Sequence, residues 1–348
     1  MLASIEIIQL RKDEHLQICI ENDVEYSIRT TGFENLVLSQ QSLPEVDFTN
    51  IDLTCEIAGK KLYAPIIISA MTGGTDYGHY INRNLAAAAQ ELGVAMVTGS
   101  QRIAIEYPQF ASFFQIRDIA PDILLFGNLG VVQLNSGYGI NECQQAVDMI
   151  GADGLTLHLN VLQELIQPGG NTNFKGLYQK LRELVERVNF PIIVKEVGFG
   201  LSKQTIESLV DINIMGIDVA GAGGTSWIKI ENLRREATLP KEVLLTLESL
   251  AISTYDSLQI AVARKRDKLV IASGGIRTGV DAVKALIIGA DLVGMALPLL
   301  KPATESAAAV KRFLENFIWE MKVAMCSLGV ETLKDLKKVG FNEVGGKI

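Results

Sequence analysis

From residue 64 onward, short apolar runs alternate with stretches of helical period, and this alternation repeats eight times. The runs are rich in Ile, Val, Leu and Ala and are continuous in their apolar character, which is typical of parallel strands buried on both faces. Eight strands that are each followed by helical sequence predict an α/β fold, a (β/α)8 TIM barrel with an N-terminal extension. The predicted strands cover residues 65–70, 94–98, 123–126, 154–159, 191–194, 216–220, 269–272 and 291–296.

Helical period between these runs predicts the outer layer of the barrel. Helices are expected over residues 82–92, 142–150, 177–188, 205–210, 243–264, 280–287 and 304–328, with a long excursion over 226–240. We expect residues 1–348 to be one domain, with the barrel over 64–330 and an N-terminal segment over 1–63. Within that segment, residues 30–62 favour a short antiparallel cover for the bottom of the barrel. An open doubly wound sheet is the alternative, but the first strand lacks the dinucleotide fingerprint.

The composition limits the partners that this chain can have. With 48% hydrophobic and 21% charged residues, the 348 residues can bury a large core. The net charge of −8 does not favour nucleic acid or an anionic membrane, and no stretch is typical of a membrane span or a signal peptide. Cys19, Cys55, Cys143 and Cys326 are far apart, as in reduced thiols of a cytoplasmic protein. We therefore expect a cytoplasmic chain that binds a small molecule through local donors.

Polar residues and glycines collect directly after the predicted strands. Each of them alone would more often be a cap or a turn former than a ligand. Their joint placement favours a site, because the carboxyl ends of all barrel strands meet at one face. The residues concerned are Met71, Thr72, Ser100, Gln101, Arg102, Asn128, His158, Asn160, Gln163, Glu164, Lys195, Thr225, Gly274, Gly275, Arg277, Ala296 and Leu297.

The loop after the seventh strand has the chemistry of a phosphate site. Gly274 and Gly275 allow backbone N–H groups to approach an anion, and Arg277 adds a fork of donors. Taken alone, the two glycines are equally well explained as formers of a tight turn. Together with the amide, hydroxyl and lysine donors of the other strand ends, the loop favours flavin mononucleotide, FMN. Lys195 then faces the N1–C2 edge of the flavin, unless it pairs with Glu196 at the rim.

Two further clusters are rich in polar residues. Of the three histidines, His158 ends a strand and is the better ligand candidate, and Glu164 in the same cluster is a hard oxygen ligand suited to Mg²⁺ beside a polyphosphate. One carboxylate is a sufficient protein contribution only because Mg²⁺ retains waters and phosphates. The charged run RKDEH at 11–15, judged from charge alone, favours a solvated helix start or a flexible arm.

These motifs together resemble the type 2, FMN-dependent isopentenyl diphosphate isomerases over roughly residues 8–330. The specific ones are RKDEH at 11–15, HLNVLQE at 158–164, VKEVGFG at 194–200 and AGAGGTSW at 220–227. AMTGGT at 70–75, GSQR at 99–102 and ASGGIRTG at 272–279 also match. Val161, where the family often has proline, and the pair Gly169–Gly170 depart from the pattern in a loop. The resemblance implies interconversion of isopentenyl and dimethylallyl diphosphate by an allylic proton shift, with FMN, Mg²⁺ and NADPH as reductant.

The resemblance also implies roles for individual residues. In the N-terminal cluster, Arg11, Lys12 and His15 are implied to bind the diphosphate as a clamp. Gln163, His158 and Lys195 are implied as catalytic residues, and Glu164 as the Mg²⁺ ligand. The other substrate contacts implied are Ser100, Gln101, Arg102, His158, Asn160 and Gln163. The implied FMN contacts are Ala70, Met71, Thr72, Ser100, Asn128, Lys195, Thr225, Gly274, Gly275, Arg277, Ala296 and Leu297.

Three other functions are open to a barrel of this kind. A 2-hydroxy acid oxidase of the FMN-dependent type needs a histidine base after a late strand, and no histidine follows His158. A barrel resembling inosine monophosphate dehydrogenase needs a cysteine after strand six, and residues 219–240 contain none. A non-catalytic flavin or phosphate binder is the third. The resemblance suggests a homo-tetramer or octamer, which composition does not decide.

Overall fold

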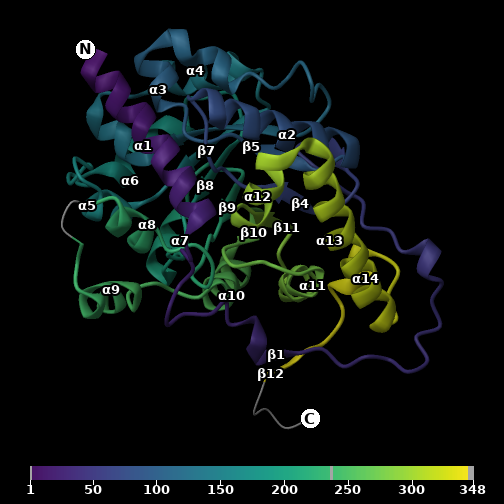
Figure 1. The fold of residues 1–348 in the computed structure, drawn as a ribbon. Coiled ribbons are helices and arrows are strands. Elements are labelled where there is room, and N and C mark those ends of the chain that lie inside the picture. The colour runs from purple at the N-terminus through teal and green to yellow at the C-terminus, as the bar shows by residue number, and fades with distance from the viewer. Residues whose placement is uncertain (1, 236–237, 344–348) are drawn as a thin grey trace.

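The computed structural model describes residues 2–235 and 238–343, and its centre is a closed barrel of eight parallel strands (Figure 1). The last strand pairs with the first, with Val293 opposite Ile66 and Met295 opposite Ile68. The predicted (β/α)8 barrel is therefore confirmed. The barrel strands are β4 (Ile66–Ile68), β5 (Ala95–Val97), β6 (Leu125–Gly130), β7 (Gly154–His158), β8 (Ile192–Lys195), β9 (Gly216–Asp218), β10 (Leu269–Ser273) and β11 (Leu292–Met295).

Several helices around the barrel begin at side-chain caps. Thr75 accepts a hydrogen bond from Gly78 N at 3.0 Å at the start of α2, and Thr278 forms a capping box with Asp281 at the start of α11. The helices are α1 (Leu2–Glu21), α2 (Asp76–Leu92), α3 (Arg102–Glu106), α4 (Ile140–Ile150), α5 (Val161–Ile166), α6 (Leu177–Val185), α7 (Lys203–Val210), α8 (Trp227–Leu233), α9 (Lys241–Glu248), α10 (Thr254–Arg264), α11 (Gly279–Ile288), α12 (Leu297–Glu305), α13 (Ala307–Ser327) and α14 (Leu333–Leu336).

One predicted helix is wrong in its continuity and another in its start. The stretch 243–264 is divided into α9 and α10, because the backbone at Ile252 extends to donate a hydrogen bond to Phe199 O at 2.8 Å. Ser253 then caps α10. The stretch 304–328 is divided between α12 and α13 at Ser306, which is fully extended and accepts a hydrogen bond from Ala309 N. Ser306 lies directly between α12 and α13, whereas α9 ends at Glu248, five residues before Ser253.

A hairpin covers the amino-terminal end of the barrel, where a short antiparallel cover is expected. It consists of β2 (Cys55–Ile57) and β3 (Lys60–Leu62) and leads directly into β4. Leu62 is buried in a cluster with Ile67, Phe126 and Ile271, which come from three different strands and so meet inside the barrel. A second two-stranded sheet, in which β1 (Leu36–Val37) pairs antiparallel with β12 (Asn342–Glu343), links the N-terminal segment to the end of the described chain.

Helix α1 lies against the carboxyl-terminal end of the barrel, next to α8, α12 and α2 (Figure 1). Leu16 anchors it in the main hydrophobic core. No helix within residues 2–235 and 238–343 combines the length and apolar character needed to cross a lipid bilayer. The carboxyl ends of the strands and α1 together enclose the space described below.

The hairpin cover gives a test of the interior packing. Leu62→Ala removes buried methyl groups from the barrel interior, so we expect the free energy of unfolding to fall by about 2–5 kcal/mol. Urea denaturation followed by circular dichroism measures this loss. Leu43→Ala is the matched control, because Leu43 is 86% exposed, and its effect should stay within about 0.5 kcal/mol. Equal effects of the two substitutions would contradict the packing of Leu62 inside the barrel.

Candidate functional site

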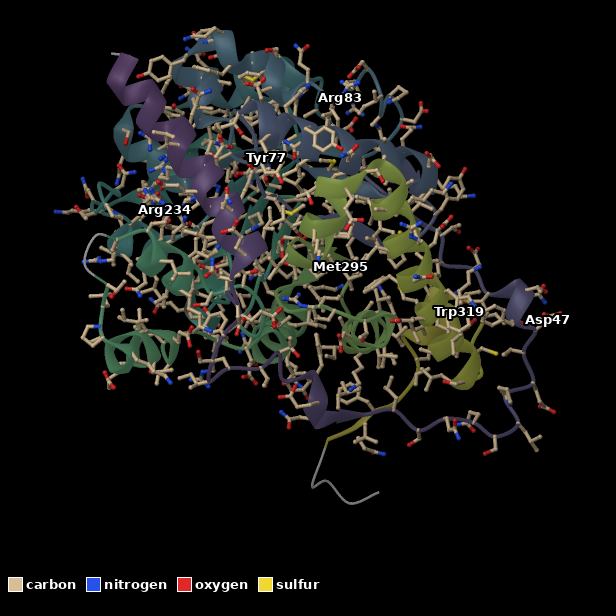
Figure 2. All side chains as sticks on the ribbon, viewed as in Figure 1. Asp47, Tyr77, Arg83, Arg234, Met295 and Trp319 are labelled. Carbon is tan, nitrogen blue, oxygen red and sulfur yellow. The ribbon has the colours of Figure 1, made fainter. Side chains whose placement is uncertain are left out.

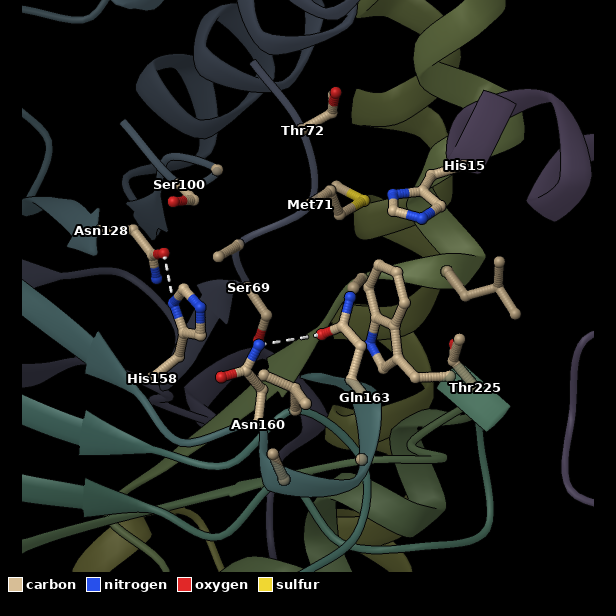
Figure 3. Close-up of a pocket in the computed structure, with 18 of the residues that line it drawn as sticks. His15, Ser69, Met71, Thr72, Ser100, Asn128, His158, Asn160, Gln163 and Thr225 are labelled. Atoms are coloured by element: carbon tan, nitrogen blue, oxygen red, sulfur yellow. Dashed lines mark hydrogen bonds between the residues drawn. The ribbon is translucent and has the colours of Figure 1, made fainter. Parts of the chain in front are cut away.

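A cavity of about 260 Å³ lies between α1 and the carboxyl ends of the barrel strands. Figure 3 shows side chains from β6 and β7 and from the loops after β4 and β5 pointing into it. It brings together residues that are far apart in the sequence, as the topology of a parallel barrel requires. Of the residues singled out from the sequence, those that line the cavity are Arg11, Lys12, His15, Ala70, Met71, Thr72, Ser100, Arg102, Asn128, His158, Asn160, Gln163, Glu164, Lys195, Thr225, Gly274, Gly275, Arg277, Ala296 and Leu297.

Gln101 is the exception, and the expectation that it faces the substrate is wrong. Its side chain is fully buried behind the cavity wall, where Nε2 donates to Ala146 O at 2.7 Å and Oε1 accepts from Asn128 N at 2.9 Å. These two bonds tie the loop after β5 to β6 and α4. Gln101 therefore supports the position of Asn128 and does not contact a ligand in the cavity.

The N-terminal charge cluster belongs to a docked helix, so the flexible arm suggested by charge alone is wrong. In α1, Lys12 Nζ donates to Ser100 O at 3.1 Å and lies 5.6 Å from the centre of the Phe114 ring. Asp13 accepts a hydrogen bond of 2.7 Å from the Thr75 hydroxyl. The charged side chains of α1 are thus fixed at the cavity, and Lys12 and Ser100 come together there as the resemblance implies.

The cations at the cavity repel one another, although Arg102 also pairs with Glu106, whose Oε1 lies 2.7 Å from Arg102 Nε. Burial, together with the neighbouring Arg11 and Arg102, lowers the pKa of Lys12 to about 7, while Asp13 opposes this shift. Burial and the positive charges of Arg102 and Arg234 also lower the pKa of Arg11. A group of positive charges that disfavour one another in this way is suited to an anionic ligand, which would relieve the repulsion.

A buried carboxylate, Glu231 of α8, organises one wall of the site. His15 Nε2 lies 2.9 Å from Glu231 Oε1, Gln163 Nε2 donates to the same oxygen at 3.2 Å, and Arg234 Nη1 lies 2.8 Å from Oε2. Burial opposes ionisation, but His15, Arg234 and Gln163 outweigh it and lower the pKa of Glu231. His15 also meets Trp227 edge to face at 5.2 Å. The site therefore holds a carboxylate that orients both a histidine and an amide.

Sequence reasoning missed Glu231, Arg234 and Trp227. They lie in the excursion over 226–240, which carried no strand and so no strand-end signal. Figure 2 labels Arg234, whose Nε also pairs with Glu14 of α1 at 3.0 Å. The signal available was the spacing of Glu231 and Arg234, three residues apart, which places both on one helix face.

The strand ends offer polar groups without partners, as a cofactor site requires. Ser69 and Thr72 are 7% and 5% exposed, and neither side-chain hydroxyl has a hydrogen-bond partner among the described residues. Gly274 and Gly275 have φ of 97° and 73°, and a Cβ on Gly274 would lie 2.0 Å from Gly221 O. A narrow backbone cradle next to unpaired buried hydroxyls fits a ligand with a phosphate and a polar ring, as FMN has.

Lys195 does not pair with the carboxylate of Glu196. Its ammonium donates to the backbone carbonyl of Glu196, whose carboxylate instead accepts from the N–H groups of Val197, Gly198 and Phe199. Asp218 lies beside Lys195 in the strand register and accepts from Ser273 Oγ at 2.6 Å. Lys195 is 6% exposed and lines the cavity. Its ammonium group therefore lies at the cavity, at the carboxyl end of β8.

Arg277 is paired within the chain. Its Nε and Nη2 donate to Glu25 Oε1 at 2.9 and 2.6 Å. Glu25 belongs to the segment after α1, which forms an antiparallel bridge with Thr225. The guanidinium expected to bind phosphate is therefore held next to the glycine cradle by an acidic residue of the N-terminal segment.

The expected metal ligand has protein partners on both oxygens. Glu164 Oε1 accepts from Asn160 Nδ2 at 3.1 Å, and Oε2 accepts from the backbone and side chain of Asn171. Asn160 Nδ2 also lies 3.3 Å from Gln163 Oε1 (Figure 3). Among residues 2–235 and 238–343, no cluster of three or more His, Cys, Asp or Glu side chains is placed to hold a metal ion.

The fold is similar to that of FMN-dependent oxidases. A lactate oxidase from Pediococcus acidilactici superposes with a TM-score of 0.69 at 16% identity, covering 97% of this chain and 94% of its own. A mandelate oxidase variant with an FMN adduct gives a TM-score of 0.65 at 18% identity, covering 97% and 96%. At this low identity the likeness is one of fold.

Sequence comparison is more specific. A model of the FMN-dependent dehydrogenase family matches residues 158–342, more than half of the chain. Isopentenyl-diphosphate delta-isomerases from Nostoc sp. and Synechocystis sp. are 44% and 46% identical, over 95% and 94% of both chains. The enzyme of that name from Rickettsia canadensis is 43% identical, over 97% of this chain and 98% of its own. The chain therefore belongs to the isopentenyl-diphosphate delta-isomerase family, in the flavin-dependent form whose barrel resembles that of the FMN-dependent dehydrogenases.

Proposed function

We propose that this chain interconverts isopentenyl diphosphate and dimethylallyl diphosphate by a 1,3-allylic proton shift, as an enzyme of isoprenoid biosynthesis. The observation that carries the proposal is the group of mutually repelling cations Arg11, Lys12 and Arg102 at the cavity that also contains the cofactor cradle. A bound diphosphate relieves this repulsion. The 2-hydroxy acid oxidase alternative shares the barrel, but it requires a histidine beyond His158, which this chain lacks.

The residues of the chain bind and orient the reactants. When bound, reduced FMN supplies the acid–base chemistry, for which the cavity offers few titratable side chains. Lys195 would contact the ring with its positive charge, and Gln163, oriented by Glu231, would lie close to the reacting carbons. His158 and Asn160 line the same space, and residues of α1 line it as well. Arg11, Lys12 and His15 bind the diphosphate. The FMN contacts proposed are those residues of the predicted cofactor set that line the cavity.

The remaining requirements are also proposals. Glu164 would hold Mg²⁺ with waters and diphosphate oxygens, after giving up hydrogen bonds from Asn160 and Asn171. NADPH would supply the electrons that reduce the flavin before the redox-neutral turnover begins. We expect a cytoplasmic homo-oligomer, a tetramer or an octamer, in accord with the resemblance.

The reaction itself is tested without oxygen. Protein with FMN, Mg²⁺ and isopentenyl diphosphate is incubated with and without dithionite, and the allylic product is followed by proton NMR. Product only in the reduced sample is the expected result, because the reduced ring has the basic and acidic positions that the protein lacks. Absence of product in both samples, with FMN bound, would leave a flavin-binding barrel of another function.

Binding of inorganic diphosphate should be coupled to protonation of Lys12. With a pKa of about 7, the free side chain is mostly neutral at about pH 8, and the bound anion raises its pKa again. We expect an uptake of up to about one proton, measured by calorimetry in buffers of different ionisation enthalpy. Lys12→Met should abolish the uptake and weaken binding, while Lys61→Met, in the hairpin at the other end of the barrel, should do neither. Uptake that persists in Lys12→Met would assign the proton to another group.

Lys195→Met tests the proposed cofactor contact. Removing a charged hydrogen-bond donor from a buried site should weaken FMN binding by about 10- to 100-fold, which corresponds to about 1.5–3 kcal/mol. Flavin fluorescence titration measures the affinity. Lys203→Met is the control, because that side chain is 62% exposed on α7. An unchanged FMN affinity and flavin spectrum in Lys195→Met would rule out the contact.

A further inference from the structure

A chain of hydrogen bonds runs from the backbone of β6 to the ring of His158. The Thr156 hydroxyl donates to Gly127 O at 2.8 Å, and Asn128 Nδ2 donates to Thr156 Oγ1 at 2.7 Å. Asn128 Oδ1 then lies 2.9 Å from His158 Nδ1, as the dashed line in Figure 3 shows. Asn128 and Thr156 are paired in the β6–β7 register and are each 2% exposed, so the relay is built into the barrel wall.

The backbone carbonyl of Gly127, at the start of this chain of hydrogen bonds, fixes the direction of every bond in it. A backbone carbonyl can only accept, so the single proton of the Thr156 hydroxyl is used on Gly127 O. The hydroxyl oxygen must therefore accept from the Asn128 amide, which turns Oδ1 of Asn128 toward the imidazole. An acceptor in that position requires a proton on His158 Nδ1.

A second proton on the imidazole is disfavoured. Burial, followed by the positive charges of Lys195 on β8 and Lys12 on α1, lowers the pKa of His158 to about 3. With Nδ1 protonated, the lone pair of the neutral ring is on Nε2. No hydrogen-bond partner of Nε2 is present among residues 2–235 and 238–343, and His158 lines the cavity.

We propose that Thr156 is a positioning residue that fixes His158 in its neutral, Nδ1-protonated tautomer, so that Nε2 acts as a hydrogen-bond acceptor toward the ligand. His158 then meets an N–H or O–H group and not an anionic phosphate oxygen. The assignment of the diphosphate to Arg11 and Lys12, and not to His158, rests on the proposed function. Thr156 itself is buried behind Asn128 and is absent from the cavity lining.

The tautomer can be observed directly, because the chain has only three histidines. Protein labelled with ¹⁵N-histidine is examined by long-range proton–nitrogen correlation, which distinguishes the two neutral tautomers from imidazolium. His15→Gln and His79→Gln assign the signals by elimination. We expect the His158 pattern to be Nδ1-protonated and unchanged between about pH 5 and 8. An Nε2-protonated or doubly protonated ring in the unaltered protein would overturn the proposal, whatever the variants do.

Substitution of the relay identifies the role of Thr156. Thr156→Val removes the acceptor of the Asn128 amide, so the two ¹⁵N shifts of His158 should move toward each other as the tautomers mix. Thr156→Ser keeps the hydroxyl and should keep the pattern of the unaltered protein. Thr98→Val is the matched control, because Thr98 is equally buried and its hydroxyl has no described partner. A pattern in folded Thr156→Val identical to that of Thr98→Val would refute the role of Thr156.

Addition of inorganic diphosphate separates this inference from the proposed function. The His158 signals should remain those of the neutral ring when diphosphate is bound, since the anion lies with Arg11 and Lys12. Protonation of His158 on binding would overturn its assignment as an acceptor. If the signals behave as expected but the reduced protein yields no allylic product, the tautomer assignment stands and the isomerase proposal fails.

Discussion

The hydrogen bonds that close the barrel between β11 and β4 are the contacts on which the site depends. Val293 N donates to Pro65 O and Ser69 N donates to Met295 O, both at 2.8 Å. They place the loop after the first barrel strand next to the loop after the last, although more than 200 residues separate the two. Gly294 is part of this fit, since a Cβ there would lie 2.6 Å from Ser69 Oγ. Without closure, the two ends of the proposed cofactor site would lie at opposite edges of an open sheet.

The barrel was predictable from the sequence because short continuous apolar runs recur eight times and each is followed by a stretch of helical period. Helix continuity was less predictable. Ser253 and Ser306 are compatible with a helix interior, yet each caps a new helix, and the segment before Ser253 is held by a tertiary contact, the bond from Ile252 N to Phe199 O. Local sequence carries no record of such a contact.

The candidate site, like the fold, was predictable only in part. Strand-end residues such as Asn128 and Lys195 were predictable, because topology alone brings them to one face. Gln101 was misplaced because a motif does not indicate which side of a loop each side chain takes. Glu231 was missed because its role in the site depends on its contact with His15, which belongs to another helix more than 200 residues earlier in the chain.

The polar groups of the cavity are arranged for a ligand and not for the stability of the empty chain. Burying the hydroxyls of Ser69 and Thr72 without partners costs free energy. Placing the positive charges of Arg11 and Lys12 close together at the cavity costs free energy as well. A ligand that satisfies those hydroxyls and neutralises those cations recovers that cost on binding, so ligand affinity and fold stability are coupled. The negative net charge of the whole chain does not prevent this, because screening limits charge interactions to about 8–10 Å. Attraction for a diphosphate must therefore come from the residues that surround it, and α1 supplies them at the open end of the barrel.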